Sequence, residues 1–199
     1  MNMRFMVAVK MTIVLTVLTG IIYPLLMVAV AHVLFPAQAE GSLLYRNGAA
    51  IGSSLIGQNF KSPGYFHSRP SAAGSNGYDA TSSSGSNLGP TNKSFIDSVK
   101  GRLKSVLEEN PGTQPSQVPV DIVTASGSGL DPEISPAAAE LQVPRVAKAR
   151  GVSEAAVRAL VGAYTRSRLA GFIGEPGVNV LEVNLALDEL QKNEPTALK

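Results

Sequence analysis

The feature that most constrains this chain is a run of 25 residues, at positions 11–35, without one acidic or basic side chain. Because an α-helix rises about 1.5 Å per residue, this run would extend roughly 37 Å and cross a ~30 Å hydrocarbon core. No comparable run recurs later in the sequence. We therefore predict a short tail at residues 1–10, one transmembrane helix at residues 11–35 and one large domain at residues 36–199.

The charges are distributed unequally about this span. All 15 acidic residues and 15 of the 17 basic residues follow it, whereas Arg4 and Lys10 precede it. Because basic residues near one end of a span hold that end in the cytoplasm, we expect a cytoplasmic N-terminus and a periplasmic or extracellular domain. The domain is formally neutral, 15 minus 15, which argues against binding to nucleic acid.

A cleaved signal peptide is the alternative to a permanent anchor, because Ala37, Gln38 and Ala39 resemble a small-x-small cleavage site. The apolar core of a signal peptide is about 7–15 residues long, and this run is far longer. The length therefore favours an anchor that stays in the lipid bilayer. The chain has no cysteine, which excludes disulfides, thiol catalysis and thiolate metal sites.

One face of the span carries small and hydroxylated side chains. Its members recur at intervals of three and four residues and are Thr12, Thr16, Thr19, Gly20 and Tyr23. Such a stripe favours close packing against another membrane helix, although the threonines could instead bond to their own helix backbone. Pro24 lacks an amide hydrogen and crowds the carbonyl of Gly20, so we predict a kink there.

Apolar periodicity predicts strands within residues 36–199. The predicted strands are residues 43–45, 50–56, 118–123 and 178–185. Asn47 and Gly48 suit a tight turn that would join the first two into a β-hairpin. The strand at residues 178–185 would lead into a short helix, although Asn179 and Glu182 also fit a helical capping box.

The predicted helices of this domain have recognisable ends. The first includes the periodic apolar positions 95–107 and stops at residues 110–112, the next two lie at residues 135–149 and 154–166, and a short one ends at residue 190. Thr91 or Asn92 caps the first and Ser153 caps the third, while Pro144 should break or bend the second. The fold class is therefore α+β, with a sheet built from distant segments.

Residues 63–90 are dense in Ser, Gly, Asn and Pro, a composition typical of a flexible loop. Tyr65, Phe66, Tyr78 and Arg69 argue against that interpretation, because a solvated linker has no use for them. Two Ser/Gly-rich segments, residues 82–90 and 123–132, could point backbone amides at an anion. A network of tight turns capped by serine hydroxyls explains the same composition and is favoured.

Signals for common chemistries are missing. There is no phosphate-binding loop and no phosphorylation sequence of a P-type pump, so ATP hydrolysis has no visible machinery. His67 is the only imidazole outside the span, and a serine hydrolase would have to use it without a Gly-x-Ser-x-Gly sequence. No histidine pair or tight carboxylate cluster predicts a metal site.

Six short segments follow the span in order. They are GQNF at 57–60, YFHSRPS at 65–71, GSNLGP at 85–90, VTASGSGLDP at 123–132, QVPRVA at 142–147 and VNVLEVNLALD at 178–188. Together they resemble the C-subunit family of the Kdp potassium-transporting P-type ATPases over nearly the whole chain. The segments from 71 to 84 and from 108 to 117 match that family only loosely.

The resemblance implies a subunit of a bacterial inner-membrane complex that has no catalytic residue of its own. The implied partners are a channel-like subunit that carries potassium and a P-type ATPase subunit that hydrolyses ATP. The implied role is in assembly and as a catalytic chaperone that raises the affinity of the pump subunit for ATP. A contact with ATP, shared with the pump subunit, is implied at Ser126, Gly127, Ser128, Gly129 and Gln142.

The charge pattern conflicts with a direct contact to ATP, because it places these five residues outside the cytoplasm. We therefore expect ATP affinity to change indirectly, with the stripe on the span contacting a neighbouring subunit and the domain covering the outer mouth of the channel subunit. The alternative is an independent, membrane-anchored periplasmic binding module or serine hydrolase.

Overall fold

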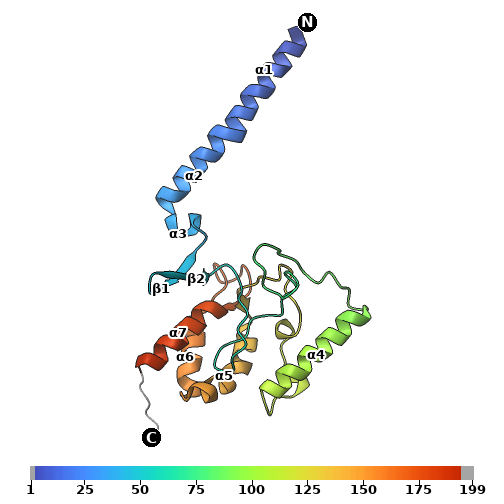
Figure 1. The fold of residues 1–199 in the computed structure, drawn as a ribbon, viewed down its shortest axis with the longest axis vertical. Coiled ribbons are helices and arrows are strands. Elements are labelled where there is room, and N and C mark those ends of the chain that lie inside the picture. Colours follow the sequence, from blue (N-terminus) through green and yellow to red (C-terminus); the bar gives the residue numbers. More distant parts are fainter. Residues whose placement is uncertain (1–2, 194–199) are drawn as a thin grey trace. The chain divides into compact units, whose positions relative to one another are not determined.

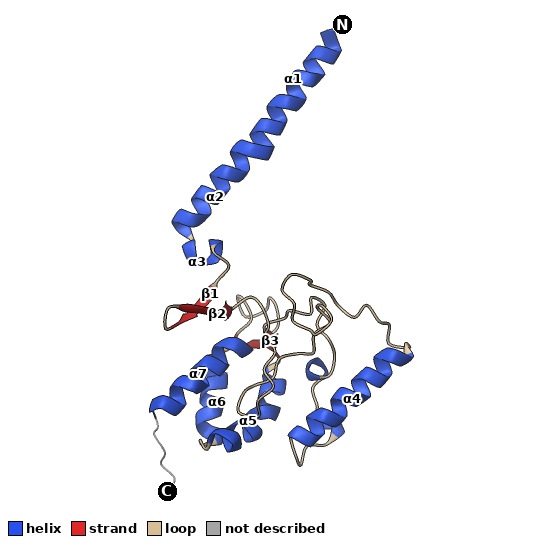
Figure 2. Ribbon diagram, viewed as in Figure 1, coloured by secondary structure: helices blue, strands red, loops and turns tan. Residues whose placement is uncertain are grey.

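The computed structural model describes residues 3–193 and confirms a mixture of helices and sheets. The chain divides into two compact units, Met1–Ser53 and Ser54–Lys199. Figure 1 gives the element labels, and Figure 2 shows how much of the second unit is loop.

The first unit begins with a continuous helical stretch, Met3–Leu34, that is long and apolar enough to cross a membrane. It consists of α1 (Met3–Val17), a π-helical turn (Leu18–Ile22) and α2 (Tyr23–Leu34). None of its side chains is buried against protein. The predicted anchor is therefore present as a helix, and it starts nearer the N-terminus than residue 11.

The π-helical turn lies directly before Pro24. The amide of Tyr23 donates to the carbonyl of Leu18, five residues back. Because Pro24 has no amide hydrogen and its ring crowds the carbonyl of Gly20, the helix departs from α geometry here. At the predicted kink the structure has a π turn, and the helix continues through it.

A short helix and a β-hairpin complete the first unit. Helix α3 (Pro36–Ala39) leads to β1 (Leu43–Arg46), which pairs antiparallel with β2 (Ala49–Ser53). Asn47 and Gly48 both have positive φ, 53° and 79°, as a primed turn requires. The predicted hairpin is confirmed, with a second strand that ends at Ser53 and not at residue 56.

The second unit combines helices with a small antiparallel sheet. The helices are α4 (Lys93–Glu109), α5 (Pro136–Arg150), α6 (Glu154–Ala163) and α7 (Val180–Asn193). The strands are β3 (Glu133–Ile134), β4 (Thr165–Arg166) and β5 (Gly177–Asn179), in the order β3-β5-β4. Because β5 pairs with β3, which lies far from it in sequence, the predicted assembly from distant segments is confirmed.

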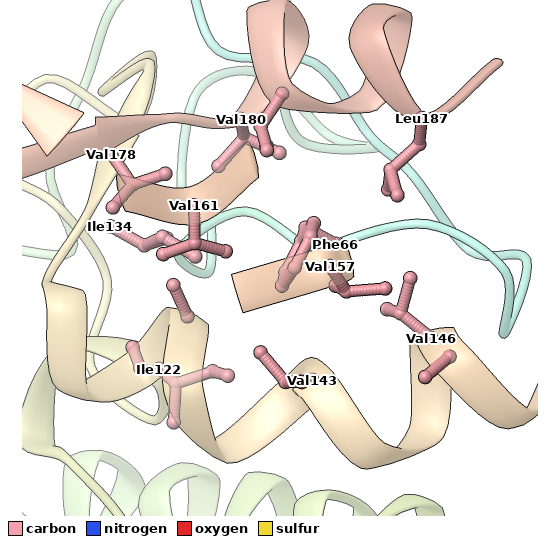
Figure 3. Close-up of a cluster of buried hydrophobic side chains, with 14 of the residues drawn as sticks. Phe66, Ile122, Ile134, Val143, Val146, Val157, Val161, Val178, Val180 and Leu187 are labelled. Atoms are coloured by element: carbon pink, nitrogen blue, oxygen red, sulfur yellow. The ribbon is translucent and has the colours of Figure 1, made fainter. Parts of the chain in front are cut away.

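The core of this unit lies where α5, α6 and α7 pack together (Figure 1). Figure 3 shows Phe66, from the long loop, between Val143 and Val146 of α5 and Leu187 of α7. Each of these four side chains has no exposed surface. The first part of this loop therefore contributes to the core and is not a solvated linker, as its aromatic residues predicted, whereas residues 79–90 are mostly exposed.

Two predicted strands are wrong. Residues 118–123 contain a 3-10 turn (Val120–Ile122), whose Asp121 carboxylate accepts the Ser135 amide at 2.7 Å and so ties the turn to the start of α5. At residues 178–185, only the first two residues are strand. The side-chain oxygen Oδ1 of Asn179 accepts a hydrogen bond from the amide of Glu182 at 3.1 Å. Asn179 therefore caps a helix, as the alternative interpretation held, and α7 begins at Val180.

The helix predicted at residues 135–149 is confirmed as α5 (Pro136–Arg150), which Pro144 does not break. Helix α6 ends at Ala163, three residues before the predicted end, because Thr165 and Arg166 leave it to pair with β5.

Candidate functional site

Residues 66 and 67 are bound along their backbone by two buried side-chain amides. The amide of Phe66 donates to Asn184 Oδ1 at 2.8 Å, and its carbonyl accepts from Asn184 Nδ2 at 3.0 Å. His67 forms the same pair of bonds with Gln142, at 2.8 Å and 3.3 Å. The two amides thus replace the neighbouring strand that this extended segment lacks.

Two arginines of α5 hold the beginning of the same segment. Arg145 donates to the carbonyls of Pro63 and Tyr65 at 2.6 Å and 3.0 Å. Arg150 lies over the Tyr65 ring, 4.5 Å from its centroid, and pairs with Asp188 of α7 at 2.9 Å. The Tyr65 hydroxyl donates to the same carboxylate at 3.0 Å. Tyr65 of the loop, Arg150 of α5 and Asp188 of α7 therefore connect these three segments through a cation–π contact, an ion pair and a hydrogen bond.

Three of the six segments that carry the family resemblance meet in this network. They are residues 65–71, 142–147 and 178–188. Sequence reasoning did not foresee the network, although one signal was available. Gln142 and Asn184 lie among the apolar residues of their helices, and a polar side chain at a core position requires a buried partner.

Gln142, one of the five residues implied in nucleotide contact, is 1% exposed. Its Oε1 accepts from the amide of His67 and from Arg145 Nη2, the latter at 2.6 Å. Its Nε2 donates to the carbonyls of His67 and Ala138. All four hydrogen-bonding positions of the amide are therefore occupied within the protein.

The other four, residues 126–129, form a loop that packs on residues 70–84. The amide of Ser126 donates to the carbonyl of Pro70 at 3.2 Å, and the carbonyl of Ser128 accepts the amide of Ser84 at 2.9 Å. The Ser128 hydroxyl accepts the amide of Leu130 at 3.1 Å. The two Ser/Gly-rich segments thus bind each other through turns, as the favoured interpretation predicted. A nucleotide contact at this loop stays a prediction.

Two neighbouring cavities lie between α4 and α5. One, of about 540 Å³, is lined by Leu141, Arg145 and Lys148 of α5 together with Glu109 and Asn110. The other, of about 440 Å³, shares Glu109 and Asn110 and includes Gln142. Within the described residues, neither lining includes residues 126–129. The structure therefore does not bring Gln142 and the Ser/Gly loop into one pocket.

His67 faces the second cavity and is engaged at both ring nitrogens. Its Nδ1 lies 3.1 Å from a Glu109 oxygen, and its Nε2 lies 3.1 Å from the carbonyl of Ser62. Burial, reinforced by the positive charge of Arg145, lowers the pKa of His67 below its ordinary 6.5 despite the opposing effect of Glu109. A ring held in this way has no nitrogen available to activate a serine, so the geometry does not support a hydrolase.

On the apolar helix, two threonines of the stripe bond to their own backbone, which is one of the two alternatives that the sequence left open. The hydroxyls of Thr12 and Thr19 donate to carbonyls four residues back, at 3.0 Å and 2.8 Å. At Gly20, an added Cβ would have only the Thr16 methyl group within 4.0 Å. The glycine therefore leaves a shallow, uncharged notch on the helix surface, and packing of another helix there stays a prediction.

Comparison with known proteins gives a consistent result. The sequence profile of the family described as KdpC, the c chain of K⁺-transporting ATPase, matches residues 5–189. A protein of Rhodopseudomonas palustris strain BisB5, named potassium-transporting ATPase KdpC subunit, is 57% identical over 91% of this chain and 94% of its own. Proteins with the same name from Koribacter versatilis and Gemmatimonas aurantiaca are 52% and 53% identical. They cover 96% and 95% of this chain, and 97% and 94% of their own.

Proposed function

Because this chain belongs to the KdpC family of K⁺-transporting ATPase c chains, we propose that it is a non-catalytic accessory subunit of an ATP-driven potassium import complex. The observation that carries the proposal is the extent of the match, which includes both the apolar helix and the domain. The family resemblance inferred from six short segments is thereby confirmed. In the proposed complex, a channel-like subunit carries potassium and a P-type ATPase subunit hydrolyses ATP.

The proposed location is the bacterial inner membrane, crossed once by the apolar helix, with the N-terminus in the cytoplasm and the domain in the periplasm. The length of the helix and the basic residues Arg4 and Lys10 ahead of its apolar part support this orientation. In that orientation the domain lies on the side of the membrane from which potassium is taken up, and it can cover the outer mouth of the channel subunit.

The proposed role is to assist assembly and to raise the affinity of the ATPase subunit for ATP without contacting ATP. Two observations support the indirect route. The Gln142 amide has all its hydrogen-bonding positions filled by the protein, and the loop at residues 126–129 is bound to residues 70–84. A nucleotide at Gln142 would have to displace bonds that hold the domain together.

Purification through an affinity tag on this chain tests the proposal. The tagged chain should bring a large channel-like membrane protein and a P-type ATPase through detergent, and the complex should hydrolyse ATP. Membranes that lack this chain should show a higher KM for ATP in potassium-stimulated hydrolysis, or no assembled complex. A chain that purifies alone would instead indicate an independent anchored protein.

A photoactivatable ATP analogue separates the indirect route from direct contact. In sealed inverted membrane vesicles, whose cytoplasmic face is outward, the analogue should label the ATPase subunit and not this chain. A label on this chain that excess ATP removes would contradict the indirect route. Such a result would leave the assignment as a subunit intact.

A further inference from the structure

Three large apolar side chains are exposed together at the end of one hairpin. Leu169, Phe172 and Ile173 are 72%, 75% and 52% exposed. Residues 169–173, which we name the apolar tip, have the sequence LAGFI and contain no polar side chain. A group of exposed apolar side chains of this kind is typical of a site where another molecule binds.

The apolar tip has a defined shape. Leu169 and Ile173 exchange backbone hydrogen bonds at 2.9 Å and 3.0 Å. Ala170 and Gly171 between them have φ of 53° and 84°, the pair of positive values that a tight primed turn requires. The three side chains are therefore presented by a closed turn, which reduces the conformational entropy lost when a partner binds.

The tip is also held firmly to the domain. It connects β4 to β5, and these strands pair antiparallel with Arg166 opposite Gly177. Ion pairs brace the base on each side, at 2.7 Å between Arg168 and Glu175 and at 2.8 Å between Arg166 and Glu133. Through β5 the tip is continuous with the sheet and the start of α7.

The surroundings of the tip favour a protein partner over a lipid surface. Segments that insert at a bilayer surface combine apolar and aromatic residues with cations that bind anionic headgroups. Here both arginines at the base of the tip are paired with glutamates. An apolar centre with a charge-neutral, polar rim is instead typical of a protein–protein contact.

We propose that the apolar tip inserts into an apolar socket on another subunit of the transport complex, with Phe172 as the central anchor. This inference rests on the proposed function as an accessory subunit. Few residues carry most of the energy of an interface, and they are enriched in aromatic side chains that fill a pocket. The tip would fix the domain to its partner independently of the membrane helix.

Copurification of the intact complex through a tag on this chain tests the inference with the variants Phe172→Asp and Val120→Asp. Val120 is 71% exposed and lies outside the tip, so it controls for a new charge at an exposed apolar position. The amount of partner subunits recovered after detergent washing should fall at least about tenfold for Phe172→Asp. It should stay at the wild-type level for Val120→Asp and for the conservative Phe172→Leu.

A photoreactive phenylalanine analogue at position 172 identifies the occupant directly. Crosslinking to another subunit of the complex supports the inference, whereas crosslinking to lipid or to a second copy of this chain overturns it. Full retention of partners by Phe172→Asp also overturns it while leaving the proposed function intact. A wild-type chain that purifies alone overturns both. Because the side chain is exposed, the thermal unfolding midpoint of Phe172→Asp should match that of wild type.

Discussion

Gly127 and Gly129 lie two residues apart in the Ser/Gly loop, but their surroundings differ. Gly129 has φ of +68°, and an added Cβ would lie 2.5 Å from the carbonyl oxygen of Ser84 and 2.6 Å from the amide nitrogen of Ala73. Gly127 has no atom within 4 Å of such a Cβ. Only the second glycine is therefore required by the fold.

We predict that Gly129→Ala lowers the free energy of unfolding by at least about 2 kcal/mol, because it combines left-handed strain with a clash against backbone. Gly127→Ala should change it by less than about 0.5 kcal/mol. Urea unfolding of the full chain in detergent checks both values. Equal effects of the two substitutions would contradict the packing of this loop on residues 70–84.

His67 should make the stability of the domain depend on pH. Because burial and Arg145 lower its pKa in the folded chain, the unfolded chain binds more protons below about pH 6.5. The stabilisation that His67 contributes to the folded state is therefore fully present above about pH 6.5. It is lost as the pH falls from that value through the lowered pKa of the folded chain. The free energy of unfolding, measured across this range, should decline less in His67→Gln than in wild type. A steeper decline in the variant would show that Glu109 dominates and that the pKa is raised.

At this scale the sequence revealed which residues are unusual but not what they contact. The aromatic residues and Arg69 correctly argued against a flexible loop, since Phe66 is fully buried and Arg69 pairs with Asp131 at 2.8 Å. The bond between His67 and Gln142 joins residues 75 positions apart. No local pattern encodes such a pair, because only the packing of α5 against the loop brings it together.

Elements were predictable where their ends are decided locally. Asn92, Ser135 and Ser153 each accept a backbone amide at the start of a helix, and each of these helices was predicted. Residues 178–185 were assigned to a strand because apolar residues alternate there. In the structure α7 is buried over a wide face, including Leu181, Val183 and Leu187, and a helix buried in this way mimics alternation.

The membrane helix supports a prediction at the scale of one element. Replacing Gly20 with leucine fills the notch beside Thr16 and should keep a neighbouring helix from close approach. Recovery of partner subunits with the tagged chain should then fall several-fold, as a loss of about 1 kcal/mol implies. Ala29→Leu adds similar bulk on α2, six positions and about 120° around the helix from Tyr23, the last residue of the stripe, and should not change the recovery. If both variants recovered equal amounts of partner subunits, the contact with those subunits would have to involve another face of the helix or the domain.

For the whole molecule, the order of the six segments predicted the family. The sequence of one chain does not predict how the subunits of the complex are arranged. Six short segments in order sufficed, and three of them meet around residues 65–67. The apolar tip was not predicted from the sequence. Its residues look like an ordinary core segment until the structure shows that no core covers them.

Orientation in the membrane is the property on which the indirect route to ATP affinity depends, and the absence of cysteine makes it measurable. Single cysteines introduced as Lys104→Cys and Met3→Cys occupy positions that are exposed in the isolated chain. In intact spheroplasts, a membrane-impermeant maleimide should label the cysteine at position 104 and not the one at position 3, because basic residues retain the N-terminus in the cytoplasm. Inverted vesicles should give the opposite labelling and thereby show that both thiols can react. If position 3 were labelled from outside and position 104 only after lysis, the domain would share a compartment with ATP. Direct contact between ATP and residues 126–129 would then become possible.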